Sequence, residues 1–201
     1  MKLQGTMRIN EAGHLEIGGV DTLDLVREFG TPLYVLDEQA FRENCRKLKE
    51  AFASAGDSQV IYASKALCTM ATCLLVKEEG LGLDVVSGGE LHTALAVDFP
   101  VEKIYFHGNN KTPEEIEMAV KNQVGVIVVD NFYEMELLNR ICQRFGREQR
   151  IILRISPGIE AHTHEYIKTG QIDSKFGFTL PGGQALEAVK RLRDYPFLVY
   201  D

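Results

Sequence analysis

Gly80-Leu81-Gly82-Leu83-Asp84-Val85-Val86-Ser87-Gly88-Gly89-Glu90 is the stretch that decides the fold class of this chain. Residues 81–86 form a short apolar run that only Asp84 interrupts, as expected of a strand buried on both faces of a parallel sheet. Ser87 and Glu90 follow at the N-cap and third-position spacing of a capping box, which starts a helix. The stretch therefore predicts one strand followed at once by one helix.

The same strand-then-helix pattern recurs along the chain. Thr112 with Glu115, and Asn131 with Glu134, repeat the helix-start signal, and Pro113 suits a first helical position. Short β-rich runs lie at residues 32–36, 60–64, 83–86, 103–106, 126–129, 151–155 and 197–200. This alternation predicts an α/β fold with a parallel sheet.

Two architectures fit this alternation, an open doubly wound sheet and a (β/α)₈ barrel. No Gly-x-Gly-x-x-Gly motif follows the first predicted strand, so the nucleotide-binding open sheet lacks its usual marker. Polar residues instead follow several different strands, as in a barrel. They are Lys65, Ser87, His107, Asp130 and Arg154. We predict a TIM-barrel type of fold with about six βα units and a seventh strand, and since a barrel takes about 250 residues, an incomplete one.

The beginning of the chain does not follow this alternation. Residues 14–17 predict a short strand, and a helix follows that is capped near Asp21. We therefore divide the chain into an N-terminal segment, residues 1–28, and a partial barrel, residues 29–201.

The composition excludes several classes of protein. The 201 residues carry a formal net charge of −7 and are 45% hydrophobic, which is typical of a globular protein and offers no basic surface for nucleic acid or anionic lipid. No apolar run reaches the about 20 residues that span a bilayer, and the first residues do not resemble a secretory signal. Four cysteines without zinc-like spacing indicate a reduced protein. We predict a soluble, cytoplasmic protein.

Three ionisable residues lie in or directly after apolar strands. Lys65 follows a strand, where its amine can form a Schiff base at the mouth of a barrel, or where it is simply a surface lysine. Asp84 requires a buried partner, either a cation or loop amides. Arg154 keeps its charge and requires an acidic partner or a ligand oxygen.

Other polar motifs have two readings each. His107-Gly108-Asn109-Asn110-Lys111 either orients a polar ligand or is a turn before the helix that Thr112 caps. Ser87-Gly88-Gly89-Glu90 either presents amides to an anion or is only a capping box. The irregular stretch 158–178 is of the kind that is functional or mobile. It contains His162-Thr163-His164, but no third ligand at suitable spacing, so we predict no metal site.

Taken together, these motifs resemble the pyridoxal-phosphate-dependent decarboxylases of fold type III, which have an alanine-racemase-like barrel. The resemblance runs from about Arg8 to the end of the chain. It is carried by Pro32-Leu33-Tyr34-Val35, Tyr62-Ala63-Ser64-Lys65-Ala66, the 80–90 stretch quoted above with Leu91, His107-Gly108-Asn109-Asn110-Lys111-Thr112, Leu153-Arg154-Ile155-Ser156-Pro157-Gly158 and Asp173-Ser174-Lys175-Phe176-Gly177-Phe178.

The resemblance implies a function and a site. Lys65 matches the catalytic lysine that binds pyridoxal 5'-phosphate covalently, and Asp84 matches an acidic residue beside it. Arg154 matches an arginine near the cofactor ring, and His107 and Asn109 would line the pocket. The implied reaction is decarboxylation of meso-diaminopimelate to lysine, in a cytoplasmic homodimer. Lys175 matches a position near the subunit interface, and residues 1–28 would join a β-domain.

The resemblance also sets expectations for what this chain can do alone. Family segments that follow the matched region carry a phosphate-binding loop, a substrate-binding arginine and a cysteine proton donor. We therefore expect the 201-residue chain by itself to bind the cofactor poorly and to decarboxylate little. The alternatives are a class I Schiff-base aldolase, an inactive fragment or regulatory relative, and a decarboxylase of another basic amino acid.

Overall fold

The computed structural model describes residues 2–158 and 176–200, and the chain divides into two compact units. The N-terminal unit comprises Met1–Val60 together with Glu78–Leu81. The sheet unit comprises Ile61–Lys77 together with Gly82–Asp201. Division of the chain near residue 28 stays a prediction.

The sheet unit is built on six parallel strands in the order β11-β8-β7-β6-β5-β4. The strands are β4 (Ile61–Ala63), β5 (Gly82–Val85), β6 (Ile104–Phe106), β7 (Val126–Val129), β8 (Gln149–Leu153) and β11 (Leu198–Tyr200). Strands β5 to β8 are neighbours in chain order, as βα units require. The predicted α/β class with a parallel sheet is confirmed.

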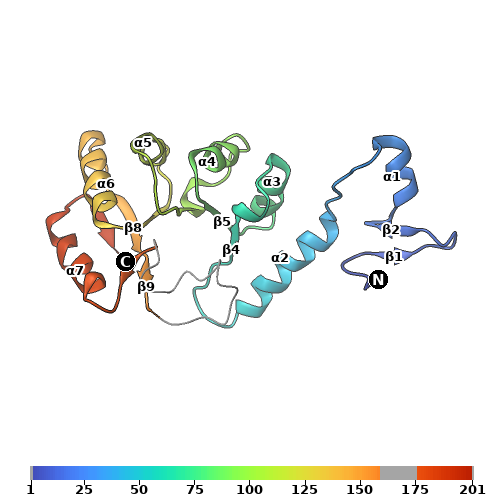
Figure 1. The fold of residues 1–201 in the computed structure, drawn as a ribbon, viewed down its shortest axis with the longest axis horizontal. Coiled ribbons are helices and arrows are strands. Elements are labelled where there is room, and N and C mark those ends of the chain that lie inside the picture. The colour runs from blue at the N-terminus through green and yellow to red at the C-terminus, as the bar shows by residue number, and fades with distance from the viewer. Residues whose placement is uncertain (1, 159–175, 201) are drawn as a thin grey trace. The chain divides into compact units, whose positions relative to one another are not determined.

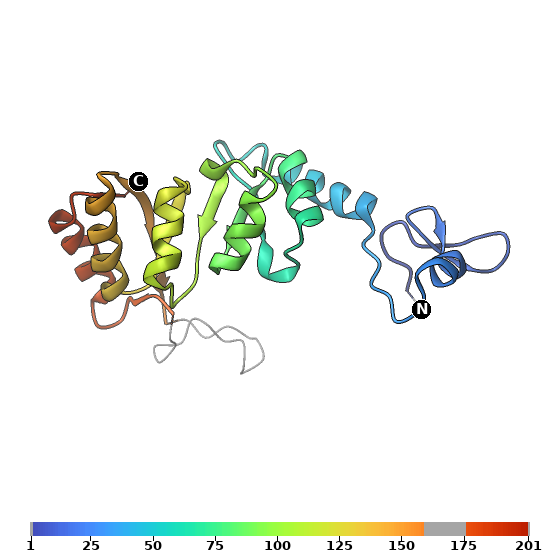
Figure 2. The same cartoon turned by 90° about the horizontal axis from the view of Figure 1, so that it is seen from above.

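Helices connect these strands and cover one face of the sheet (Figure 1). They are α3 (Met70–Glu78), α4 (Gly88–Leu95), α5 (Pro113–Lys121), α6 (Phe132–Phe145) and α7 (Gln184–Arg191), with short 3₁₀ turns at Ser64–Ala66, Val101–Lys103 and Leu192–Asp194. Seen from above, α3 to α6 follow one another in chain order (Figure 2). A two-stranded parallel pair, β9 (Ile155–Ser156) with β10 (Phe178–Thr179), completes the unit.

The core lies between the sheet and these helices. Leu83, Ile104 and Ile127 of the strands are fully buried there, as are Ile116 of α5 and Leu138 of α6. Burial of each such side chain stabilises the fold by about 1.5–3 kcal/mol. This packing of the sheet against its helix layer holds the strands, and with them their carboxyl ends, in place.

The other face of the sheet is partly open to solvent. Residues that pair across neighbouring strands point to the same face of a sheet. The register pairs Ile61 with Gly82, Val128 with Ile152, and Arg150 with Val199, so the two members of each pair share a face. Strand β7 is buried at every residue, as a continuous apolar run predicts, but Ile152 of β8 is 43% exposed. The prediction that strands are buried on both faces is thus confirmed for β7 and wrong for β8.

Residues 32–36, expected to be the first strand of the barrel, do not form one. Within the described residues this segment is extended but pairs with no strand, and Leu33, Tyr34, Val35 and Leu36 are all exposed. The strand prediction here is wrong because β propensity produces a strand only where a neighbour supplies hydrogen-bond partners.

The N-terminal unit begins with a small antiparallel sheet of β1 (Arg8–Ile9), β2 (Leu15–Ile17) and β3 (Val20–Asp21). Helix α1 (Thr22–Phe29) follows, and the Asp21 carboxylate caps it by accepting from Leu23 N–H at 2.8 Å. Both the strand near residues 14–17 and the cap at Asp21 are confirmed. Helix α2 (Glu38–Phe52) is capped in the same way by Asp37, which accepts from Ala40 N–H at 3.0 Å.

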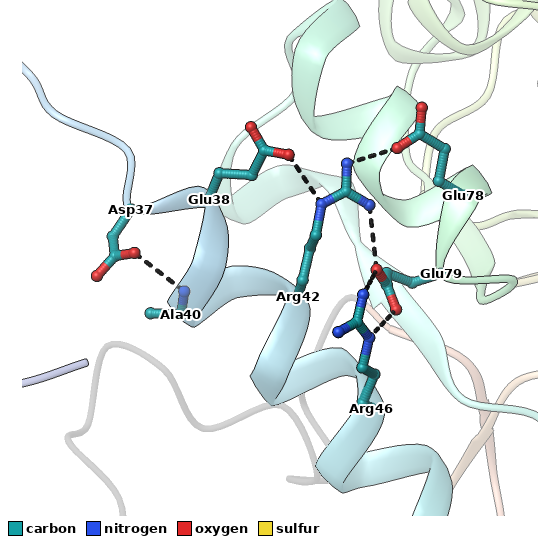
Figure 3. A network of polar contacts seen from close by, with 7 residues as sticks. All are labelled: Asp37, Glu38, Ala40, Arg42, Arg46, Glu78 and Glu79. Carbon is teal, nitrogen blue, oxygen red and sulfur yellow. Dashed lines mark hydrogen bonds and ion pairs between the residues drawn. The ribbon is translucent and has the colours of Figure 1, made fainter. Parts of the chain in front are cut away.

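A charged network lies on α2 of this unit (Figure 3). The Arg46 guanidinium donates twice to the Glu79 carboxylate, at 2.7 and 2.8 Å, and Arg42 donates to Glu79 at 3.0 Å and to Glu78 and Glu38. Hydrogen bonds from Arg46 and Arg42 lower the pKa of Glu79 from its ordinary 4.5 to about 2. Glu79 therefore stays ionised under all but strongly acidic conditions.

None of the helices in the described part of the chain is both long and apolar enough to cross a bilayer.

Candidate active site

A cavity of about 530 Å³ opens at the carboxyl ends of the strands. Its walls bring together all five residues that the sequence singles out, Lys65, Asp84, His107, Asn109 and Arg154, and add Val86, Gly108 and Phe176. These residues come from loops after β4, β6 and β8, from β5 itself and from the segment before β10. Parallel strands end at one edge of their sheet, which is why residues distant in sequence meet there.

Lys65 lies in the 3₁₀ turn Ser64–Ala66 directly after β4. The preceding Ser64 is buried, and its hydroxyl donates to the Glu90 carboxylate at 2.7 Å. Lys65 itself is exposed at the cavity wall, and none of the residues that the structure describes forms a hydrogen bond or ion pair with its ammonium group. A fixed backbone thus presents an amine that is available to a ligand.

Asp84 and His107 form a pair across the sheet. Asp84 lies in β5 opposite Ala63 of β4, and its Oδ1 is 2.5 Å from Nδ1 of His107. The His107 backbone N–H donates to the Val85 carbonyl at 2.8 Å, which fixes the start of the loop. The partner expected for Asp84 was a lysine imine, a cationic cofactor or loop amides. In this structure it is the His107 ring.

Arg154 has the buried acidic partner that its position requires. Its Nη1 donates to Oδ1 of Asp130 at 3.1 Å, and its guanidinium lies 4.3 Å from the centre of the Phe176 ring. Asp130, only 3% exposed, also accepts from Gly177 N–H at 3.0 Å. A side chain at Gly177, where φ is +74°, would place its Cβ 2.6 Å from the Arg154 carbonyl oxygen. Asp130 therefore joins Arg154 to the segment before β10.

The loop after β6 serves as a turn and also lines the cavity. Gly108 has φ +111°, and a Cβ there would lie 2.9 Å from the Val86 carbonyl oxygen, so the loop packs too closely for a side chain. Lys111 is buried beneath it and donates to the Gly108 carbonyl at 2.7 Å. The loop then leads into the helix that Thr112 caps, so the reading as a turn is confirmed, and the reading as a segment that orients a ligand stays a prediction.

The three predicted helix starts differ in what their glutamates do. Thr112 and Glu115 form a complete capping box. Ser87 and Asn131 cap α4 and α6 as predicted, but Glu90 accepts from Val86 N–H and Glu134 pairs with Lys111. The complete box predicted at Ser87 is therefore wrong, since Glu90 bonds elsewhere. The anion reading also weakens there, because Gly88 N–H already donates to Glu115 at 2.7 Å.

A family model described as "Pyridoxal-dependent decarboxylase, pyridoxal binding domain" matches residues 38–195. The chain belongs to this family. Its fold is the alanine-racemase-like α/β fold of pyridoxal-dependent decarboxylases, as predicted, and the described strands and helices form part of the barrel.

Several relatives of this decarboxylase domain carry one name. The chain is 57% identical over 191 residues to the diaminopimelate decarboxylase of Bacillus methanolicus and 56% identical over 193 residues to that of Bacillus subtilis. These matches cover 94% and 96% of the chain, which spans 44% of the length of either relative. The crystal structure of diaminopimelate decarboxylase from M. jannaschii is similar with a TM-score of 0.89 and 34% identity, over 97% of this chain and 46% of that one.

The sequence does not predict two parts of the candidate site. Phe176 stacks on Arg154 although only its place in a family-like stretch pointed to it, and Asp130 was noted as a residue after a strand but not as the partner of Arg154. Lys175 and the His162-x-His164 pair lie outside the described residues. Within residues 2–158 and 176–200, no three His, Cys, Asp or Glu side chains gather where they would hold a metal ion.

Proposed function

We propose that this chain contributes the pyridoxal-phosphate-binding part of an enzyme that decarboxylates meso-diaminopimelate to lysine, in lysine biosynthesis. The observation that carries the proposal is one cavity whose wall holds Asp84, His107, Asn109, Arg154 and Lys65, whose ammonium has no partner among the described residues. The identity of the substrate is supported by relatives 56–57% identical to this chain.

The residues present suit the cofactor. A volume of about 530 Å³ lies within the range of about 300–1,000 Å³ that small-molecule sites occupy. Lys65 supplies an amine for covalent attachment, and the Arg154 guanidinium and Asn109 amide supply donors for an anionic, polar molecule. Val86 and Phe176 add apolar side chains to the wall of the cavity.

The chain's own residues have separate tasks in this proposal. When bound, pyridoxal phosphate supplies the electron sink that makes loss of the substrate carboxylate feasible. Lys65 would hold the cofactor through its amine. The Asp84 carboxylate orients the His107 ring, which lines the cavity, through its contact with Nδ1. Asp130 fixes the direction of the Arg154 guanidinium.

The other functions considered for this chain have less support. Membership of the pyridoxal-dependent decarboxylase family gives no ground for a class I aldolase. A decarboxylase of another basic amino acid is represented among similar structures by lysine/ornithine decarboxylase from Vibrio vulnificus, but at 23% identity that likeness concerns the fold alone. We therefore place diaminopimelate first and other basic amino acids second.

Assembly and location belong to the same proposal. We propose a homodimer in the cytoplasm, with residues 1–28 joining a β-domain of the complete enzyme. The family resemblance supports the dimer and the β-domain. All four cysteines, Cys45, Cys68, Cys73 and Cys142, are free, which is the usual state in a reducing compartment.

Covalent trapping tests the proposal. The purified chain is incubated with pyridoxal phosphate over a range of concentrations, reduced with borohydride and mapped by mass spectrometry. We expect saturable labelling at Lys65 and a visible absorption band before reduction, both lost in Lys65→Ala. The control Lys121→Ala, at an exposed lysine of α5, retains both. Labelling spread evenly over surface lysines would contradict the proposal.

A companion assay addresses the reaction and its substrate. The trapping-competent chain is supplied with meso-diaminopimelate, L-lysine and L-ornithine in separate reactions, and released CO₂ is measured. We expect little turnover by the 201-residue chain and, in a longer protein carrying these residues, turnover of meso-diaminopimelate above the other two. Preferential turnover of ornithine or lysine would overturn the substrate assignment and leave the cofactor assignment in place.

A further inference from the structure

Lys111 is a fully buried lysine directly beneath the candidate site. Its side chain is 1% exposed, and its ammonium has three partners. It donates to the Gly108 carbonyl at 2.7 Å and to the Val128 carbonyl at 2.9 Å, and it lies 2.7 Å from Oε1 of Glu134, whose side chain is 4% exposed. Two of the three donors of the ammonium group are therefore used on carbonyls within the protein, and the ion pair with Glu134 adds a third contact there.

Glu134 departs from its local role to make this contact. It occupies the third position of α6, where a glutamate normally closes the capping box on the N-cap residue. Its carboxylate instead reaches Lys111, which lies in the loop of the preceding βα unit, and the other oxygen accepts from Asp130 N–H at 3.4 Å. Desolvation raises the pKa of Glu134, and Lys111 opposes that rise. Burial of both charges carries a desolvation cost, which their attraction and the added hydrogen bonds offset.

The pair holds the loop that carries His107 and Asn109. The loop is fixed at its start by the bond from His107 N–H to the Val85 carbonyl, at 2.8 Å, and at its middle by the bond from Lys111 to the Gly108 carbonyl. The second carbonyl bound by Lys111 belongs to Val128 of β7, so the ammonium ties the loop to the neighbouring strand. Gly108, with φ +111°, has no side chain that would hold the loop by packing.

We propose that Lys111, paired with Glu134, is a positioning residue that holds the His107–Asn109 loop at the cavity wall and thereby sets the affinity of the site for its cofactor. This inference rests on the proposed function. Lys111 acts through the loop and not on the cofactor, because its buried ammonium is engaged by two backbone carbonyls and the Glu134 carboxylate. Its effect passes through the Gly108 carbonyl to the two side chains on either side.

Two variants separate positioning from stability. Lys111→Met leaves the Glu134 charge buried without its partner, so this variant loses stability. Lys111→Met/Glu134→Leu replaces the ion pair by apolar side chains, which restores the urea midpoint to near that of the wild type but leaves the Gly108 and Val128 carbonyls without the ammonium. Lys121→Met, at an exposed lysine of α5 that pairs with Glu117, is the matched control.

Two readouts are taken on all four proteins. The first is amide hydrogen exchange without any cofactor, compared between a peptide covering residues 107–112 and one covering β7. The second is the pyridoxal phosphate concentration that half-saturates borohydride-trapped labelling of Lys65. In the stable double variant we expect faster exchange in the loop peptide only, and a half-saturating concentration roughly 5- to 10-fold higher, as the loss of about one hydrogen bond implies.

The outcomes distinguish this inference from the proposed function. If the double variant is stable and both its loop exchange and its labelling curve match the wild type, Lys111 is only a structural residue and the inference is overturned. If the wild type shows no selective labelling of Lys65, the proposed function fails. In that case, unchanged loop exchange would overturn the holding role of Lys111, and faster loop exchange would support it.

Discussion

Removal of the Asp130 carboxylate tests how the arginine side of the site is held together. Asp130 lies directly after β7 and accepts two hydrogen bonds, from Arg154 Nη1 at 3.1 Å and from Gly177 N–H at 3.0 Å. Asp130→Ala removes both acceptors. Asp130→Asn keeps one acceptor oxygen but removes the charge. The two variants therefore remove graded parts of one interaction.

The expected loss follows from these two bonds. A hydrogen bond to a charged group contributes about 1.5–3 kcal/mol to folding. The Arg154 side chain is 30% exposed, so water recovers part of its loss, whereas the carboxylate itself is 3% exposed. We expect the free energy of unfolding to fall by about 3 kcal/mol in Asp130→Ala, roughly a 150-fold change in the folding equilibrium, and by about 1–2 kcal/mol in Asp130→Asn.

Urea unfolding followed by circular dichroism measures these losses. The control is Glu187→Ala, which removes an exposed pair with Arg191 on α7 and for which we expect no measurable change. The order of stability should be wild type, then Asp130→Asn, then Asp130→Ala. An alanine variant within about 0.5 kcal/mol of the wild type would refute the reasoning, because it would mean that solvent replaces both bonds without cost.

Three further predictions concern other parts of the chain. Gly177→Ala should lower the free energy of unfolding by about 2 kcal/mol, since its Cβ would meet the Arg154 carbonyl oxygen at 2.6 Å with φ at +74°; an unchanged urea midpoint would contradict this. Hydrogen bonds from Arg46 lower the pKa of Glu79 from 4.5 to about 2 in the folded protein. Ionised Glu79 therefore stabilises the folded state above pH 4.5, and this contribution is lost as the pH falls towards 2. The melting temperatures of wild type and Glu79→Gln should therefore differ at neutral pH and converge near pH 2, and a constant difference would count against this. Leu138→Ala, at a fully buried site, should cost about 2–5 kcal/mol in urea unfolding, whereas a loss below 1 kcal/mol would show that the core collapses around the gap.

The sequence predicted the strands that lie inside the sheet and the residues at their ends. Val126–Val129 is an uninterrupted apolar run, and it forms the fully buried β7. His107 follows a predicted strand, whereas Arg154 is predicted inside one and in fact comes directly after β8. Because parallel strands end at one edge, both residues line the same cavity. These features depend on local patterns and on one rule of topology, so one sequence is enough to find them.

Features that depend on a distant partner could not be predicted. Residues 32–36 have the composition of a strand, but nothing in a sequence shows whether a neighbouring strand is present. The sequence predicts that Arg154 has an acidic partner but not which one. The pairing with Asp130, and the position of Phe176 over the guanidinium, depend on how two loops fold against each other. Asp84 had several candidate partners, and only the structure identifies His107.

The helix starts explain why residues on separate strands share one site. Glu90, Glu115 and Glu134 each occupy the third position of a helix, and each carboxylate also bonds to the βα unit before its own. Glu90 binds Ser64 beside Lys65, Glu115 binds Gly88 at the start of α4, and Glu134 binds Lys111 beneath the loop after β6. Because each loop is held from the next unit along the chain, a substitution at a helix start acts first on the preceding loop. The geometry of the cavity is therefore a property of consecutive units, and no single loop determines it alone.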